Sequence, residues 1–128
     1  MKIPKRHQTI MPYVMVKGAQ KFYDFTTAVF NAEETIRKFR EDGKTVMHSE
    51  IRINGGTIMF CEATEEWKEQ TANLFIYVED ADATFQKAVD AGAEVIMPLM
   101  DQDYGRTCGV KDTVGNTWWI TSTKGVQN

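Results

Sequence analysis

The chain has 128 residues, of which 42% are hydrophobic and 26% are charged. These values predict one folded domain spanning residues 1–128 and exclude a disordered or low-complexity protein. The 15 basic and 18 acidic residues leave a net charge of −3, which argues against a nucleic-acid binder with a broad basic face. The apolar stretches are too short to span a bilayer, so we expect no membrane partner.

The first residues are basic but lack the apolar region of a signal peptide. We expect this segment, including His7, to be frayed and without a role. Cys61 and Cys108 are too few for a disulfide framework, so we expect free thiols in a reducing compartment. The sequence therefore predicts a small, soluble, acidic protein of the cytoplasm.

The first half of the chain contains patterns typical of strands, a helix and a hairpin turn. Its predicted elements are a strand at 13–16, a helix after 17–20, a looser strand within 36–46, and a hairpin of strands 45–53 and 57–61. The apolar side of the helix carries Phe22, Phe25, Val29 and Phe30. The glycine pair after Asn54 is typical of a tight hairpin turn.

The second half repeats this order. Its predicted elements are a strand at 74–78, a helix from the N-cap Asp80 to a stop at Gly92, a strand at 93–97 ending at Pro98, and a hairpin of strands 107–111 and 117–121. Phe85, Ala88 and Val89 are expected to face inward from the helix. Val16 then corresponds to Val78, and Gly55 to Gly115.

Each half therefore reads as a βαβββ repeat, the first over about 8–62 and the second over about 72–123. Residues 63–71 are polar apart from Trp67 and form a plausible surface linker. One open sheet of this kind cannot bury its faces alone. We therefore predict an α+β fold in which two βαβββ repeats form a curved mixed sheet around a cup, with the helices on the outer face.

At this point the sequence resembles the vicinal oxygen chelate superfamily, which includes glyoxalase I, bleomycin-resistance proteins and extradiol dioxygenases. The segments that carry the resemblance are 12–16, 22–25, 48–53, 77–83, 91–93 and 112–116, within about 8–123. The resemblance is closest to the PhnB-like branch, also called 3-demethylubiquinone methyltransferase-like. It is specific for a fold and not for a reaction. A methyltransferase is disfavoured because the chain lacks a G-x-G-x-x-G nucleotide fingerprint.

The resemblance also implies where metal-dependent members hold a divalent ion. Carried over to this chain, the four ligand positions are Met11, Met59, Asn73 and Trp119, and a register shift of two would replace Met59 and Trp119 by Cys61 and Thr121. Divalent metals of this kind prefer imidazole and carboxylate ligands. We therefore expect no metal and no other cofactor.

Strand alternation predicts what the cup contains. Its ligand-binding candidates are Tyr13, Met15, His48, Glu50, Met59, Asn73, Phe75, Tyr77, Arg106 and Trp119. An apolar pocket with a few polar groups is typical of a small-molecule site, although the methionines and Trp119 could equally pack a closed core. Trp118 is expected in the core, and Cys61 has no basic neighbour in sequence that would lower its pKa. The charged loop at 101–106 could cover the cup or simply be solvated.

Two functions stay open. The resemblance implies a homodimeric, metal-independent binding protein whose aromatic side chains stack on a planar ligand, with Glu50 or Asp103 attracting a cationic one. The alternative is a metal-dependent lyase or dioxygenase with a relocated metal site, in which His48 and Glu50 are the catalytic candidates. These two side chains could also form a solvated pair without any role. Two donors on one strand are too few for a metal, which favours binding.

Overall fold

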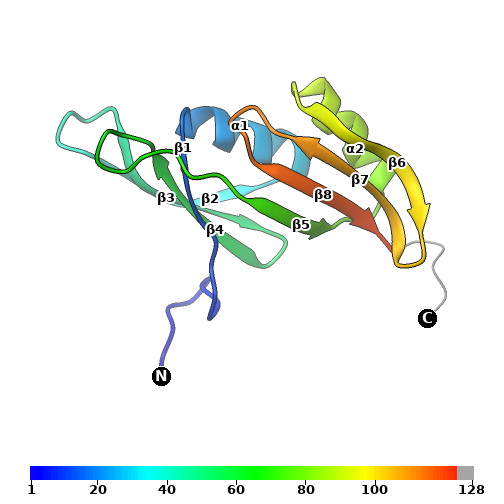
Figure 1. Ribbon diagram of the computed structural model, residues 1–128. Helices are drawn as coiled ribbons and strands as arrows, with labels where there is room; N and C mark the ends of the chain where they lie inside the picture. Colours follow the sequence, from blue (N-terminus) through cyan, green and yellow to red (C-terminus); the bar gives the residue numbers. More distant parts are fainter. Residues whose placement is uncertain (124–128) are drawn as a thin grey trace. The chain divides into compact units, whose positions relative to one another are not determined.

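The computed structural model describes residues 1–123, and these form two compact units, Met1–Thr71 and a second unit that begins at Ala72 (Figure 1). Each unit is one βαβββ module with a four-stranded mixed sheet and a single helix. The prediction of an α+β fold built from two βαβββ repeats is confirmed. Within residues 1–123, no helix has the length and apolar character that crossing a membrane requires.

The first module contains β1 (Tyr13–Val16), α1 (Ala19–Phe30), β2 (Glu33–Phe39), β3 (Val46–Ile53) and β4 (Gly56–Glu62). Its strands are ordered β1-β4-β3-β2, with β1 parallel to β4 and the other pairs antiparallel. The turn between β3 and β4 consists of Asn54 and Gly55, whose φ angles of 42° and 94° fit a tight hairpin. The loose strand expected within 36–46 is wrong in its bounds, because β2 begins earlier and a turn follows Phe39.

Helix α1 packs its predicted apolar side on this sheet. All four predicted residues are buried, and the ring of Phe22 meets the ring of Phe60 at 4.9 Å between centroids. Val14 and Val16 of β1 are also buried. Strand alternation then leaves Tyr13 and Met15 on the other face of the sheet, away from the core of the module.

The N-terminus of α1 is capped from a distance. Gly18 has a φ of 113° and offers no side-chain cap. The carboxylate of Glu62, at the end of β4, instead accepts hydrogen bonds from the N–H groups of Gly18 at 2.9 Å and Ala19 at 2.8 Å. This contact joins the beginning of the helix to the last strand of the same module.

The second module contains β5 (Asn73–Tyr77), α2 (Ala81–Asp90), β6 (Glu94–Gln102), β7 (Gly105–Lys111) and β8 (Thr117–Ser122), with strand order β5-β8-β7-β6. The predicted caps are confirmed, since Asp80 accepts from the N–H of Ala83 and Gly92, with a φ of 100°, follows the helix. The prediction that Val89 faces inward is wrong, because its side chain is 36% exposed. The buried residues of this helix are Ala81 and Ala88.

Strand β6 continues through Pro98, so the predicted end at this residue is wrong. Pro98 lies where the pairing of β6 with β7 shifts register, between Met97 and Met100. Because β6 is an edge strand, the missing N–H of a proline is tolerated there. The expected loop at 101–106 is correspondingly reduced to a turn at Asp103 and Tyr104.

The core of the second module is organised around Trp118, as predicted. Its indole N–H donates to the carboxylate of Asp112 at 2.8 Å, and the same carboxylate accepts from the backbone N–H of Val114 and Asn116. Trp118 and Asp112 are both buried. A buried carboxylate with this many donors fixes the turn that leads into β8.

Candidate functional site

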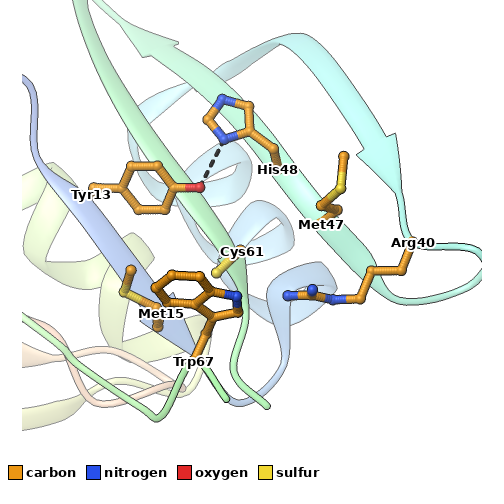
Figure 2. A pocket seen from close by; sticks show the side chains of 7 residues that line it. All are labelled: Tyr13, Met15, Arg40, Met47, His48, Cys61 and Trp67. Carbon is orange, nitrogen blue, oxygen red and sulfur yellow. Dashed lines mark hydrogen bonds between the residues drawn. The ribbon is translucent and has the colours of Figure 1, made fainter. Parts of the chain in front are cut away.

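A pocket of about 400 Å³ lies in the first module, on the face of its sheet that carries Tyr13 and Met15 (Figure 2). The side chains that line it are Tyr13, Met15, Arg40, Met47, His48, Cys61 and Trp67. Two aromatic rings, two thioethers and one thiol make most of this surface apolar, while Arg40 and His48 supply its strongly polar groups. An apolar cavity with few polar groups suits a small organic molecule.

The connector after β4 contributes Trp67 and is fixed to the first module. Gln70 and Met15 exchange two backbone hydrogen bonds, of 3.0 and 2.9 Å. The backbone N–H of Trp67 donates to the hydroxyl of Thr64 at 2.9 Å. The indole is nevertheless 50% exposed. A large aromatic side chain that is held in place yet left open to solvent is available to a ligand.

A row of hydrogen bonds joins Tyr13 to His48, Glu50 and His7. The Tyr13 hydroxyl lies 2.9 Å from His48 Nδ1, and His48 Nε2 lies 2.7 Å from Glu50 Oε2. The other carboxylate oxygen of Glu50 lies 2.6 Å from His7 Nε2. Because an ionised carboxylate only accepts, both Nε2 atoms donate, and a neutral His48 accepts from Tyr13 at Nδ1.

His7 is therefore not a frayed residue, and that expectation is wrong. Besides the contact of His7 with Glu50, the side chain of Gln8 donates to the carbonyl of Thr57 at 3.0 Å, and the Thr57 hydroxyl bonds the carbonyl of Arg6. These contacts attach the N-terminal segment to β3 and β4. Basic and polar composition alone gave no sign of the partners that this segment meets in the fold.

The pKa values in this row favour an ionised Glu50 and a protonated Tyr13. Burial of the Glu50 carboxylate raises its pKa, but the hydrogen bonds from His48 and His7 outweigh burial and leave the pKa below its ordinary value. Burial, followed by the nearby Cys61 thiol, raises the pKa of Tyr13. At neutral pH Tyr13 therefore keeps its phenolic proton.

Cys61 is a buried thiol with a raised pKa, and burial is the main cause. The expectation that its pKa is not lowered is confirmed. The fold nevertheless brings a basic residue near, because the positive charge of Arg40 acts on the thiol and partly opposes burial. Arg40 is distant in sequence and reaches the pocket from the turn between β2 and β3.

The pocket lining includes three residues that the sequence did not predict: Arg40, Met47 and Trp67. Met47 is the extra residue where β2 pairs with β3, since Lys38 pairs with His48 and Phe39 with Val46. Such a bulge breaks the two-residue alternation from which inward-facing positions were predicted. The available signal for Trp67 was a single large aromatic residue within a polar connector.

Met59 is also a predicted ligand-binding residue. It belongs to β4, which lies between β1 and β3, the strands that carry Tyr13 and Glu50. In the sheet it is paired with Tyr13 on one side and with Glu50 on the other. It is half-buried, but it is not part of the pocket lining. The structure thus brings Tyr13, Met15 and His48 together at the pocket, with Glu50 and Met59 directly beside them.

The second module brings four predicted residues together on one face of its sheet: Asn73, Phe75, Tyr77 and Trp119. The Trp119 indole donates to the Asn73 side chain at 3.2 Å, and the rings of Phe75 and Tyr77 are 5.2 Å apart. Trp119 lies across Gly109, where an added Cβ would come within 2.5 Å of the indole ring. The absent side chain of this glycine makes room for the tryptophan.

Arg106 is not brought into this aromatic group. Its guanidinium donates to Asp82 of α2 at 2.9 Å and to Asp101 of β6 at 3.3 Å. Hydrogen bonding to Asp82 is the main cause that raises the pKa of Arg106. Arg106 therefore joins the helix to the sheet within its own module.

The residues do not fit the divalent metal that the fold implies. Thioether, amide and indole groups occupy the four positions that the resemblance assigns to ligands, namely Met11, Met59, Asn73 and Trp119. Across residues 1–123, no group of three or more His, Cys, Asp or Glu side chains could hold a metal ion. His7 and His48 direct their Nε2 atoms at the Glu50 carboxylate itself.

Two βαβββ modules, each with a four-stranded mixed sheet and one helix, define a protein of the vicinal oxygen chelate class. The family model described as "Glyoxalase/Bleomycin resistance protein/Dioxygenase superfamily" matches residues 7–120. The chain belongs to this superfamily. An uncharacterized protein of Mycobacterium bovis is 34% identical over 121 residues, which cover 85% of this chain and 79% of that protein.

Solved structures show the same fold at low sequence identity. The PhnB protein of Bacillus cereus is 19% identical, with a TM-score of 0.69, and the match covers 90% of this chain and 99% of that one. TnmS3, an antibiotic binding protein of a Streptomyces species, is 16% identical, with a TM-score of 0.69, and the match covers 91% and 98% of the two chains. These two structures are thus equally similar to this chain in fold.

Proposed function

We propose that the protein binds a planar small molecule, without a metal ion, in the pocket of the first module. The observation that carries this proposal is the composition of the pocket lining: Tyr13 and Trp67 offer aromatic rings, and Met15 and Met47 offer thioethers that adapt to a flat ligand. The antibiotic binding protein TnmS3, which shares the fold, makes small-molecule binding a reasonable function for this architecture.

The first experiment is a thermal-shift screen of planar aromatic compounds, followed by calorimetric titration of those that stabilise the protein. Trp67→Ala should weaken their binding about tenfold or more, because an aromatic contact and its buried area are lost. The half-exposed position of Trp67 in the connector predicts little loss of stability.

Trp119→Ala is the matched comparison, since Trp119 is the tryptophan that the sequence nominates for ligand binding and it belongs to the second module. Affinity lost in Trp119→Ala and retained in Trp67→Ala would reject the pocket of the first module as the binding site. Affinity lost only in Trp67→Ala would support it.

The metal-dependent lyase or dioxygenase that uses His48 and Glu50 is the alternative function. The hydrogen bonds that occupy both oxygens of Glu50 argue against it. Elemental analysis of protein purified without chelator tests it directly, and we expect no stoichiometric Zn, Ni, Mn or Fe. A stoichiometric metal that is lost in His48→Ala would favour the enzyme.

We also propose that the protein is a homodimer, as the resemblance implies, and that it resides in the cytoplasm. The free cysteines Cys61 and Cys108 are consistent with a reducing compartment. Light scattering coupled to gel filtration tests the dimer, and a monomer at micromolar concentration would contradict it. Membership of the PhnB-like branch stays a prediction.

A further inference from the structure

Arg40 differs from the other residues of the pocket because it brings a full positive charge. It directly follows β2, and its backbone is held by two hydrogen bonds, from its N–H to Thr45 at 2.8 Å and from the N–H of Gly43 to its carbonyl at 2.9 Å. Figure 2 shows its side chain extending toward Cys61 and Trp67. The turn between β2 and β3 therefore fixes where the guanidinium enters the pocket.

Within the described part of the chain, the guanidinium of Arg40 forms no contact ion pair, and its charge acts on the Asp42 carboxylate only from beyond contact distance. Its Nε is buried and has no hydrogen-bond partner among residues 1–123, and none of the ion pairs found there includes Arg40. Leaving a buried, charged N–H group without an acceptor costs free energy. The pocket thus contains a hydrogen-bond donor, the Nε of Arg40, for which the described part of the module supplies no acceptor.

Two acidic side chains close to Arg40 or to the pocket, Asp42 and Glu50, have their oxygens engaged by other donors. The carboxylate of Asp42, two residues away, accepts hydrogen bonds from the N–H groups of Lys44 and Thr45 and from the Thr45 hydroxyl. Both oxygens of Glu50 are held by imidazoles. The pocket lining, as far as residues 1–123 supply it, includes no acidic side chain. A negatively charged ligand in the pocket would supply the acceptor that the Arg40 Nε lacks.

We propose that the pocket selects planar aromatic carboxylates, an inference that rests on the proposed binding function and names its ligand class. The flat guanidinium fork of Arg40 matches the two oxygens of a carboxylate. An aromatic ring attached to that carboxylate would contact Trp67 and the thioethers of Met15 and Met47. The sequence suggested that Glu50 or Asp103 would attract a cationic ligand. Such a ligand would instead be repelled by the positive charge of Arg40.

The test compares 2-naphthoate with its uncharged analogue 2-naphthamide by calorimetric titration at neutral pH. We expect the protein to bind 2-naphthoate about tenfold or more tightly than 2-naphthamide, as a charged hydrogen-bonded pair provides. Arg40→Met keeps an apolar stem but removes the charge, so it should lower the affinity for 2-naphthoate to that for 2-naphthamide. The affinity for 2-naphthamide, whose carbonyl offers the guanidinium only a neutral acceptor, should fall much less.

Lys44→Met is the matched control, since it removes one positive charge from an exposed side chain of the same turn. It should leave both affinities unchanged, and equal losses in the two variants would reduce the effect to net charge and overturn the inference. Circular dichroism checks that Arg40→Met is folded, and Arg40→Lys, which keeps the charge but loses the fork, should bind 2-naphthoate with intermediate affinity.

The remaining outcomes separate this inference from the proposed function. Equal affinity for the two probes, with binding that depends on Trp67, would overturn the carboxylate preference and leave the binding function intact. Unchanged 2-naphthoate affinity in folded Arg40→Met would do the same. Binding of neither probe, or binding unaffected by Trp67→Ala, would count against both proposals.

Discussion

At the scale of single residues, Glu50 depends on two imidazoles that come from different parts of the chain. His7→Ala removes the partner of Oε1 and leaves His48 on the other oxygen. Since Glu50 is buried, we expect the free energy of unfolding at pH 7 to fall by about 1–2 kcal/mol. Urea denaturation measures this change. Lys5→Ala, an exposed position in the same segment, is the control and should have little effect.

The same variant should also change the response to acid. The lowered pKa of Glu50 means that its contribution to stability is complete above the ordinary value of 4.5 and is lost as the pH falls through the folded pKa. Without His7, the pKa of Glu50 should rise, as measured by carboxyl-carbon NMR titration. The difference in stability between the original chain and His7→Ala should shrink as the pH falls below this range. A constant difference would show that His7 acts by packing alone.

At the scale of elements, α1 depends on a carboxylate from the opposite end of its module. Glu62→Gln keeps the size of the side chain but removes the charge that lies at the helix N-terminus. We expect a loss of about 1 kcal/mol in the free energy of unfolding, because a charged cap is replaced by a neutral one. Thermal and urea denaturation measure it. Glu65→Gln, an exposed acid of the connector, should be neutral, and equal losses in both would reject the cap.

The sequence predicts those parts of the site that depend on local patterns within an element, and not those that depend on contacts between distant elements. Periodicity found both helices and the hairpins, because each depends on neighbours within a few residues, and the same order of elements in both halves revealed the repeat. Alternation correctly placed Tyr13 and Met15 on one face, yet it missed Met47, which a bulge displaces. Arg40 and His7 enter through contacts between distant segments, and one sequence contains no signal for such contacts. The sequence therefore predicted His48 and Glu50 from alternation along their strand but gave no sign of Arg40 and His7, which distant segments bring to them.

For the molecule as a whole, buried thiols should limit stability in alkali. Burial raises the pKa of Cys108 from 9.0 to about 11, so the unfolded chain loses this proton first as the pH rises. The stability that the protonated thiol provides is complete below pH 9 and is lost as the pH rises through 11. One pKa unit corresponds to about 1.4 kcal/mol. Titration of this thiol should therefore lower the free energy of unfolding by roughly 2 kcal/mol between neutral pH and a pH of about 11.

Urea denaturation between neutral pH and the alkaline range, in the presence of a reductant, tests this expectation. Cys108→Ala should be less stable at pH 7 because it leaves a small cavity in the core. Its stability should nevertheless fall less steeply with pH than that of the original chain, since the titrating group is gone. The slope should not vanish, because burial also raises the pKa of Cys61. Parallel pH profiles for the two proteins would contradict the assignment and would place the alkaline sensitivity in other groups.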